Sequence, residues 1–434
     1  MKTLVLALLL IPATLVAQDS LTIDRALALA LNNNYGIVVA RNNTEISKNN
    51  AAPGNAGLLP TLSASGNYNY SLTNSTLEFA GDIPPTEIDG ATSIGMGASL
   101  GMNYTLFDGM GTINNYQKLK TASDISEDQA RLEIENTLMQ VLNAYYEVAR
   151  LQGSKENALL ALSISQERLK RAKVGQEFGT GTRLQVLNAE VDLNTDSVNL
   201  VNAEAQLGNA MRTLNYLLGG KGGEDTPVST KVTYRDDLSL AGLRNRALSN
   251  NAALVVASGN LSLAQLDVKT SQSGRYPRLA ANASYGYNRN QNDASIVLDN
   301  QSLGFSGGLT LNFDIFDGNR RKIAVQNARI ALENSQQLQE QSRLLVDKDV
   351  TNAWFTYQSR LAVLNAEQTG VRTAQLNFDK TRDLFNLGQA TNTDFRQAQL
   401  NLQRAQNRLN DARYLAKLAE LDCLRLSGDL LRQD

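Results

Sequence analysis

Histidine is absent from this chain of 434 residues, and cysteine occurs once, as Cys423. Without histidine, Ser-His and Cys-His catalysis and histidine metal ligation are excluded, and one cysteine forms no intrachain disulfide. Lys and Arg number 41 against 43 Asp and Glu, so the chain has no net positive charge that would indicate a nucleic-acid partner. We therefore expect no enzyme, no cofactor and no nucleic-acid partner.

Long hydrophobic runs are also missing, because no stretch beyond the N-terminus approaches the about 20 apolar residues of a membrane helix. At the N-terminus, Lys2 precedes an apolar run, and Leu15-Val16-Ala17 follows it. This order is typical of a secretory signal peptide over residues 1–17, cleaved after Ala17; the alternative is a short buried helix. The predicted cleavage site contains no cysteine, so a bacterial lipid anchor is not supported.

A short joint occurs twice, at residues 104–109 and 313–318, and both copies end in Phe-Asp-Gly. The same offset of 209 residues aligns Gly179 with Gly388 and Thr182 with Thr391. We interpret the chain as an internal duplication. The first repeat covers residues 18–220, a linker covers 221–236, and the second repeat covers 237–434.

Each repeat reads as helix, strand, strand, long helix and return helix. Apolar residues alternate with small or polar ones before each joint, which predicts strands, and about seventy residues nearly free of Gly and Pro follow it, which predicts a helix. The expected helices are 21–52, 110–177 and a return helix to 218, then 237–273, 318–387 and a return helix to 426. The expected strands are 61–70, 93–106, 277–287 and 303–315.

The strands have small polar residues on the face opposite the apolar one, a pattern typical of a transmembrane β-barrel. We expect Tyr68, Tyr70, Tyr104, Tyr285 and Tyr287 toward one strand end, as an interfacial girdle. Four strands are too few to close a barrel, since the smallest barrels have about eight strands. An open sheet edge is not tolerated in lipid. The pattern therefore predicts an oligomer with four strands from each chain. The alternative is an ordinary half-buried sheet.

The return helices carry apolar residues at alternating spacings of three and four, which predicts coiled-coil packing. Only Asp196 interrupts this seam. A second stripe in the first repeat predicts packing against two neighbours, as in the wall of a tube; the alternative, a solid bundle core, is disfavoured by the few large aromatic residues. The seam in the second repeat comprises Phe395, Ala398, Leu402, Ala405, Leu409, Ala412, Ala416, Ala419, Cys423 and Leu426, and the second stripe comprises Leu184, Leu187, Val191, Val198 and Val201.

With these repeats, joints and the turn motif Gly388, Thr391, Asp394 and Ala398, the chain resembles the TolC-type outer-membrane efflux channel family over nearly its whole mature length. The resemblance implies a mixed α and β membrane protein. It would be a homotrimer in the bacterial outer membrane, with a 12-stranded transmembrane β-barrel in the lipid. A long α-helical coiled-coil tube would continue it into the periplasm.

The implied function is the passive exit duct of a tripartite efflux pump or a type I secretion system. Its partners would be a periplasmic adaptor (membrane fusion protein) and an inner-membrane pump. The alternative function is a periplasm-spanning structural or adhesive coiled-coil protein of the outer membrane. The four alternating strands argue against it, because such a protein needs no strands.

The resemblance also implies a periplasmic gate, since family members carry constriction-lining aspartates six and nine residues after the second turn glycine. Those positions hold Asp394 and Gln397, and the first repeat has Gln185 and Asn188 there. One acidic ring is therefore matched and the other is replaced by an amide; the alternative for Asp394 is a helix-capping residue. The turns are expected at the periplasmic tip, where adaptor hairpins dock. They comprise Gly179, Thr180, Gly181 and Thr182, and Gly388, Gln389, Ala390 and Thr391.

Overall fold

A computed structural model describes residues 20–78, 80–223 and 225–430, so the expected signal peptide, residues 1–17, lies outside the described residues. The chain divides into two compact units. Unit 1 holds the described residues up to 42, residues 128–255 and those from 341 onward, and unit 2 holds 43–127 and 256–340. Each unit therefore combines segments of both repeats.

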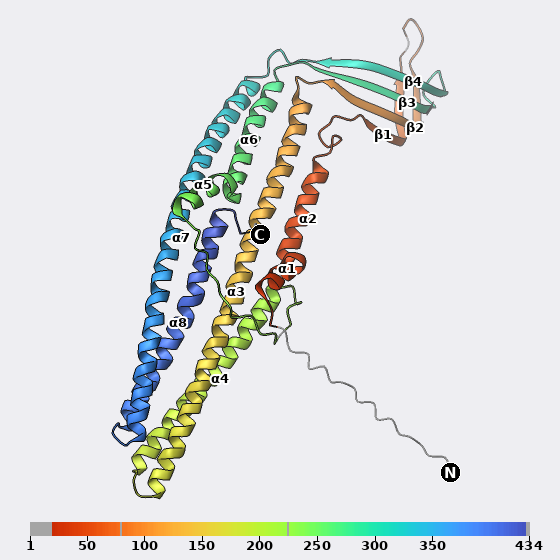
Figure 1. Cartoon of the computed structure of the whole chain (residues 1–434). Coiled ribbons are helices and arrows are strands. Elements are labelled where there is room, and N and C mark those ends of the chain that lie inside the picture. The colour runs from red at the N-terminus through yellow and green to blue at the C-terminus, as the bar shows by residue number, and fades with distance from the viewer. Residues whose placement is uncertain (1–19, 79, 224, 431–434) are drawn as a thin grey trace, which may run out of the picture. The chain divides into compact units, whose positions relative to one another are not determined.

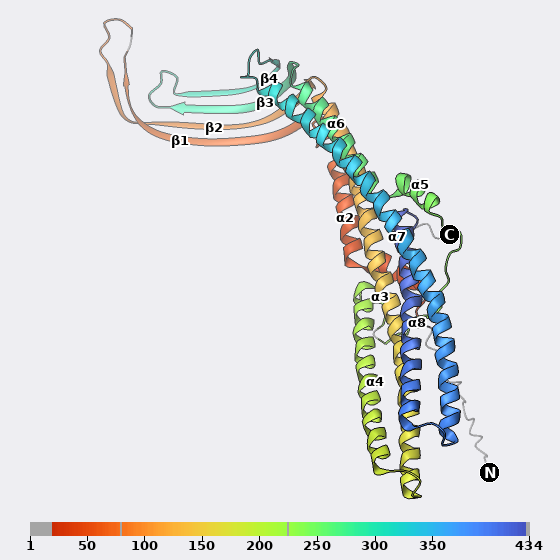
Figure 2. The same cartoon turned by 90° about the vertical axis from the view of Figure 1, so that its left-hand side faces the viewer.

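Unit 2 contains a four-stranded antiparallel sheet in the order β1-β2-β3-β4 (Figure 2). The four expected strands are confirmed, but most are longer than their alternation indicated. The outer part of β2 pairs only with β1, from Leu72 opposite Thr92 to Leu77 opposite Thr86. A register shift after Thr73 interrupts the pairing there, so the alternation of residues in the sequence did not predict this part. Another expectation was wrong, because β4 ends before the apolar residues that adjoin the second joint. The strands are β1 Thr61–Leu77, β2 Thr86–Phe107, β3 Arg278–Asn292 and β4 Asp299–Asn312.

The sheet presents one apolar face and one polar face, as the alternation predicted. On the polar face, hydroxyl groups pair across strands, with 2.9 Å between the Oγ atoms of Ser65 and Ser99. The tyrosines were not all expected correctly. Tyr68 pairs with Met96 far along β1, whereas Tyr104 lies one residue beyond the pairing partner of Thr61, at the start of β1. Neighbouring strands run in opposite directions, so a late position in β2 lies at the early end of β1.

Each joint ends a strand and starts a long helix by the same chemistry. The Asp108 Oδ2 atom accepts a 2.8 Å hydrogen bond from the Thr112 backbone N–H, and Asp317 Oδ2 accepts one of 3.0 Å from the Arg321 N–H. The next residue, Gly109 or Gly318, has a φ of +68° or +66°, in the left-handed region that favours glycine. The aspartate of each joint therefore caps the long helix that follows, and the glycine permits the turn before it. The helices are α3 Gly111–Glu177 and α7 Arg320–Asn386, each of 67 residues.

The first helix of each repeat was expected to be continuous, and this was wrong, because an extended asparagine breaks it in both repeats. The Asn34 Nδ2 atom donates to the Leu217 carbonyl at 2.8 Å, and Asn251 Nδ2 donates to Leu426 at 2.9 Å. Each return helix therefore ends against the break in the first helix of its repeat. The broken helices are α1 Ile23–Asn33 with α2 Tyr35–Asn50, and α5 Leu240–Asn250 with α6 Ala252–Ser273; the return helices are α4 Arg183–Leu217 and α8 Asn392–Leu426.

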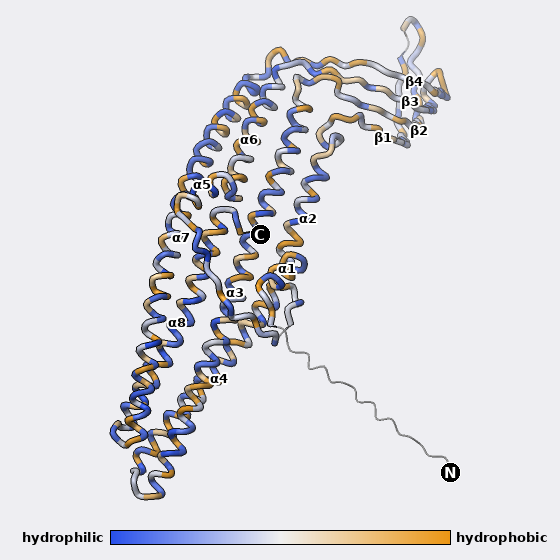
Figure 3. Tube along the Cα trace, in the orientation of Figure 1, coloured by the Kyte–Doolittle hydropathy of each residue, from blue (hydrophilic) through white to orange (hydrophobic). Residues whose placement is uncertain are grey.

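The main hydrophobic core of unit 1 forms where α1, α3, α4, α5, α7 and α8 meet the segment between the repeats. Tyr145 on α3 is 2 % exposed, and its hydroxyl donates to the Leu21 carbonyl at 2.8 Å, beside the bridge between Leu21 and Val228. Along the helices, apolar and polar residues interleave (Figure 3).

None of the described helices has both the length and the apolar character required to cross a membrane.

The seam of α8 is confirmed, since eight of its ten residues are buried and Leu409 and Ala419 are half-buried. The second stripe, on α4, is exposed within one chain: Leu184 and Val191 are each 66 % exposed, and Val201 is 64 % exposed. Water is a poor solvent for such a stripe.

Candidate gate and turn site

The α3–α4 and α7–α8 turns lie at the same end of unit 1 (Figure 1). Gly179 and Gly388 have φ values of +73° and +74°, and a Cβ added to either would meet no atom within 4 Å. Their backbone N–H groups donate to Gln176 and Phe385, each at 3.1 Å. Glycine at this left-handed position ends a helix without steric cost. The two turns are therefore built alike and present an open surface.

Both return helices begin with a capping box, in which a threonine and the residue three positions later satisfy each other's backbone N–H groups. In α4 the Gln185 N–H donates to Thr182 Oγ1 at 3.3 Å, and the Thr182 N–H donates to Gln185 Oε1 at 2.8 Å. In α8 the corresponding bonds between Asp394 and Thr391 are 3.1 Å and 3.0 Å. Two of the four expected gate residues therefore also cap their helices.

The capping box affects the charge of Asp394. The Thr391 hydroxyl donates to Asp394 Oδ2 at 2.6 Å, and the Thr391 N–H donates to the same atom. These bonds hold the pKa of the exposed Asp394 carboxyl below its ordinary range. Asp394 therefore caps α8. Because its pKa is lowered, its carboxylate is charged at neutral pH. Capping does not remove the charge that a gate would use.

The other expected gate residues lie near these caps. Gln397 follows Asp394 on α8, and its Nε2 atom donates to Asn401 Oδ1 at 2.9 Å. Asn188 follows Gln185 by the same three residues on α4. All four side chains are exposed within the single chain. The structure thus places one pair at the start of each return helix.

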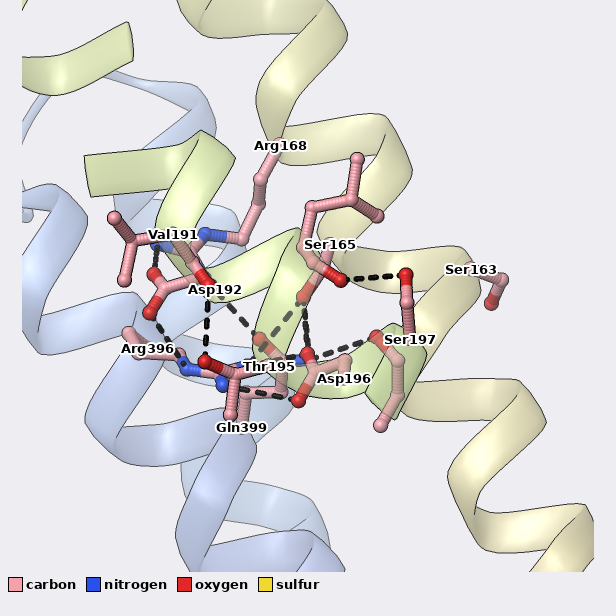
Figure 4. A network of polar contacts seen from close by, with 12 residues as sticks. Ser163, Ser165, Arg168, Val191, Asp192, Thr195, Asp196, Ser197, Arg396 and Gln399 are labelled. Atoms are coloured by element: carbon pink, nitrogen blue, oxygen red, sulfur yellow. Dashed lines mark hydrogen bonds and ion pairs between the residues drawn. The ribbon is translucent and has the colours of Figure 1, made fainter. Parts of the chain in front are cut away.

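A buried charged network lies close to these helix starts and joins α3, α4 and α8 (Figure 4). Asp196 on α4 is 1 % exposed and pairs with Arg396 on α8 through distances of 2.6 Å and 3.0 Å. Ser165 on α3 donates its hydroxyl to Asp196 Oδ2. Burial by itself would lower the pKa of Arg396, but the hydrogen bond and charge of Asp196 reverse this and raise it. The ion pair therefore keeps the buried Arg396 guanidinium charged.

A second pair completes the network. Arg168 on α3 is 3 % exposed and contacts Asp192 on α4 at 3.0 Å. It also donates to Asn392 Oδ1 at 2.8 Å, at the first residue of α8. Burial lowers the pKa of Arg168, and Asp192 opposes this. The two arginines and two aspartates balance in charge, so the helices meet without an unpaired buried charge.

Sequence reasoning found only one member of this network, Asp196, as the residue that interrupts the seam. Arg168, Asp192 and Arg396 carried no such signal, because isolated charged residues on a helix are usually solvated. The interruption itself was the usable sign, since a buried acid requires a partner.

The chain matches the family model described as outer membrane efflux protein over residues 26–220 and 243–429. Among curated proteins, it is 25 % identical over 434 aligned residues to the outer membrane efflux protein BepC of Brucella suis, covering 98 % of this chain and 90 % of the relative. It is also 25 % identical over 300 residues to the outer membrane protein TolC of Vibrio cholerae, covering 68 % of each.

The fold is similar to that of the Campylobacter jejuni CmeC outer membrane channel, with a TM-score of 0.78 at 14 % identity. That comparison covers 95 % of this chain and 87 % of the solved chain. The likeness extends over both helical and strand regions, so the fold is of the TolC type.

Proposed function

The chain belongs to the outer membrane efflux protein family and is an exit duct of the bacterial outer membrane for efflux or type I secretion, and on this premise we propose that three copies assemble into one duct. The four-stranded sheet supports this proposal most directly. In the described residues the sheet ends at β1 on one side and β4 on the other. Unpaired backbone groups at such edges are not tolerated in lipid. Three sheets joined edge to edge give a closed barrel of twelve strands.

The two faces of the sheet fit a duct wall. The apolar side chains, such as Leu62 and Phe305, are highly exposed in the single chain and would face outer-membrane lipid. The opposite face carries Ser, Thr, Asn and Gly and would line a wet lumen. The proposed duct conducts passively and performs no catalysis.

The turns at the end of unit 1 are the proposed docking tips for a periplasmic adaptor, which would connect the duct to an inner-membrane pump. These tips are residues 179–182 and 388–391. Their shared backbone geometry and open surroundings support this assignment.

The proposed gate lies directly beyond these tips. In a trimer, three Asp394 carboxylates would surround one axis and favour cations at a constriction. Gln397, Gln185 and Asn188 would contribute uncharged polar groups beside them. The exposure of all four side chains and the lowered pKa of Asp394 support this role.

The proposed chain organisation is a cleaved signal peptide, residues 1–17, followed by repeats 18–220 and 237–434. The matching order of helices and strands in the two repeats supports it. In the linker, residues 221–236, the described positions contain no helix and no strand.

Light scattering of the detergent-solubilised protein, with the detergent mass subtracted, tests the assembly. We expect three times the mass of the mature chain, together with discrete conductance steps in planar bilayers. A monodisperse monomer would contradict the trimer. A trimer without conductance would favour the structural or adhesive alternative.

A further inference from the structure

An open cavity of about 480 Å³ lies in unit 2, at the end of the sheet where the long helices begin. The end of β2, the start of α3 and the turn between α6 and β3 form its walls. A Cβ added to Gly109 would lie 2.6 Å from the Ser273 carbonyl oxygen and 2.7 Å from the Tyr276 ring atom Cδ2. The first joint therefore packs directly against that turn, and contacts within one chain hold the cavity.

Two cations, Lys269 and Arg275, line this cavity. Within the part of the chain that the structure describes, neither side chain forms an ion pair or a hydrogen bond. The acids that neighbour the cavity in the sequence are engaged elsewhere, because Asp267 pairs with Lys118 at 2.5 Å and Asp108 caps α3. The cavity therefore presents two positive charges without a carboxylate partner.

The duplication indicates that the fold does not require these charges. Before the strands the two repeats are offset by 217 residues, which aligns the prolines that precede β1 and β3. Lys269 and Arg275 then correspond to Ala52 and Leu58. The first repeat thus passes from helix to strand with uncharged residues at both positions. The two cations serve another purpose, and an anionic ligand is the one that their chemistry fits.

Exposed apolar side chains border the two cations. Phe107 and Met110 are 43 % and 54 % exposed, and Tyr276 is 59 % exposed. Phe107 pairs across the sheet with Leu279, which lies on the apolar face. Because directly paired residues share a face, Phe107 extends the proposed lipid-facing surface to the edge of the cavity. A ligand there would meet positive charge on one side and an apolar surface on the other.

Positive charge in the sheet region is concentrated at this end. Residues 49–117 contain no Lys or Arg, and between residues 279 and 319 only Arg289 is basic. Arg289 pairs with Asp299 at 2.8 Å. Basic clusters beside membrane-spanning segments attract anionic lipid headgroups. The position of the cavity therefore matches the level at which lipid phosphates would lie around the proposed barrel.

We propose that this cavity binds an anionic glycerophospholipid from the outer-membrane leaflet that faces the periplasm. Lys269 and Arg275 hold the phosphate, and an acyl chain lies along Phe107. The inference rests on the proposed barrel, which places this end of the sheet at the membrane surface. The bound lipid fixes the level of the first joint in the membrane.

Native mass spectrometry of the detergent-solubilised, delipidated full chain, titrated with phosphatidylglycerol, counts the bound lipid. We expect one tightly bound lipid per chain. The variant Lys269→Ala/Arg275→Leu copies the first repeat and should fold, but its lipid affinity should fall by about tenfold or more. Lys269→Arg/Arg275→Lys keeps both charges and should bind like the wild type. Arg320→Ala/Lys322→Ala removes two charges at the second joint and should leave binding unchanged.

Equal lipid binding by the wild type and Lys269→Ala/Arg275→Leu would overturn the site. An equal loss in Arg320→Ala/Lys322→Ala would also overturn it, because the attraction would then be a general effect of charge. Glycerol phosphate carries the same anionic group without acyl chains. If it displaces phosphatidylglycerol at equal concentration, the cavity binds a free phosphate ester and not a lipid.

Light scattering of the same samples separates this inference from the proposed assembly. A trimeric mass without the selective loss of lipid overturns the lipid site alone. A monomeric mass overturns the trimer, whereas the lipid counts still test the site, because the cavity lies within one chain.

Discussion

Arg396 of α8 and Asp196 of α4 form a two-bonded ion pair that is nearly closed to water, with Nη1–Oδ2 and Nη2–Oδ1 distances of 2.6 Å and 3.0 Å. Their side chains are 12 % and 1 % exposed. The pair joins two return helices that are far apart in sequence, close to the turns. At the equivalent positions of the other repeat, the chain has Leu187 and Ala405.

We therefore expect Asp196→Ala to destabilise unit 1 by about 3 to 5 kcal/mol, because it leaves Arg396 buried without its two bonds to the Asp196 carboxylate. Urea unfolding of the detergent-solubilised protein, followed by helical circular dichroism, measures the loss. The double variant Asp196→Ala/Arg396→Leu copies the residues of the other repeat and should recover much of it. If the double variant unfolds no later than the single one, the ion pair is not what matters at this position.

The helix breaks give a second prediction. Asn34 Oδ1 accepts from the backbone N–H groups of Gly36 and Ile37, at the start of α2. Asn34→Ala removes this cap oxygen and leaves the Leu217 carbonyl without its amide donor, so we expect a loss of about 2 kcal/mol. Asn34→Asp keeps the cap oxygen but places a carboxylate oxygen against the Leu217 carbonyl, so it should not recover this loss. Asn251→Ala should behave like Asn34→Ala, because Asn251 binds Leu426 in the same way. Urea midpoints that match the wild type for both alanine variants would show that these asparagine hydrogen bonds do not stabilise the helix breaks.

Substitutions at the turns test adaptor docking. Gly388→Glu adds a bulky charge to the proposed docking surface and should abolish export while trimers remain in the membrane. Gly388→Ala is the matched control, because it has a similar left-handed backbone cost but adds only a methyl group. Gly179→Glu and Gly179→Ala form the equivalent pair. Export by cells that carry both glutamates would rule out these turns as docking sites.

Channel selectivity tests the gate. Asp394→Asn removes the proposed ring of charge, so cation selectivity and divalent-cation block should weaken without a large change in trimer stability. Reversal potentials in a salt gradient, measured for wild type and variant, decide this. Gln397→Glu is a useful opposite change, because it adds a second acidic ring and should strengthen the block. Identical reversal potentials in all three proteins would leave Asp394 with its capping role alone.

The pH dependence of selectivity follows from the Thr391 hydrogen bonds. They lower the pKa of Asp394, so the charge persists as the pH falls and is lost only below the ordinary carboxyl range of about 4. Repulsion within a trimer acts in the opposite direction. Thr391→Val removes the hydroxyl donor, so cation selectivity should disappear at a higher pH than in the wild type. An unchanged pH midpoint would show that Thr391 does not set this charge.

Much of the architecture followed from the sequence because it depends on local patterns. Alternation along the strands, the Gly- and Pro-poor stretches and the Asp-Gly joints act over a few residues each. Because the same pattern recurs in both repeats, the sequence predicted α3, α7 and both turns to within a few residues of their observed bounds. Asp196 showed itself only as an interruption of the seam.

Contacts between distant segments were decided by the tertiary structure. The breaks at Asn34 and Asn251 exist because each side chain reaches the end of a return helix, and no local pattern encodes that partner. The end at which Tyr104 lies depends on strand pairing, and the partners of Asp196 depend on how α3, α4 and α8 meet. A sequence determines which groups need partners, whereas only the packed chain determines which partners they find.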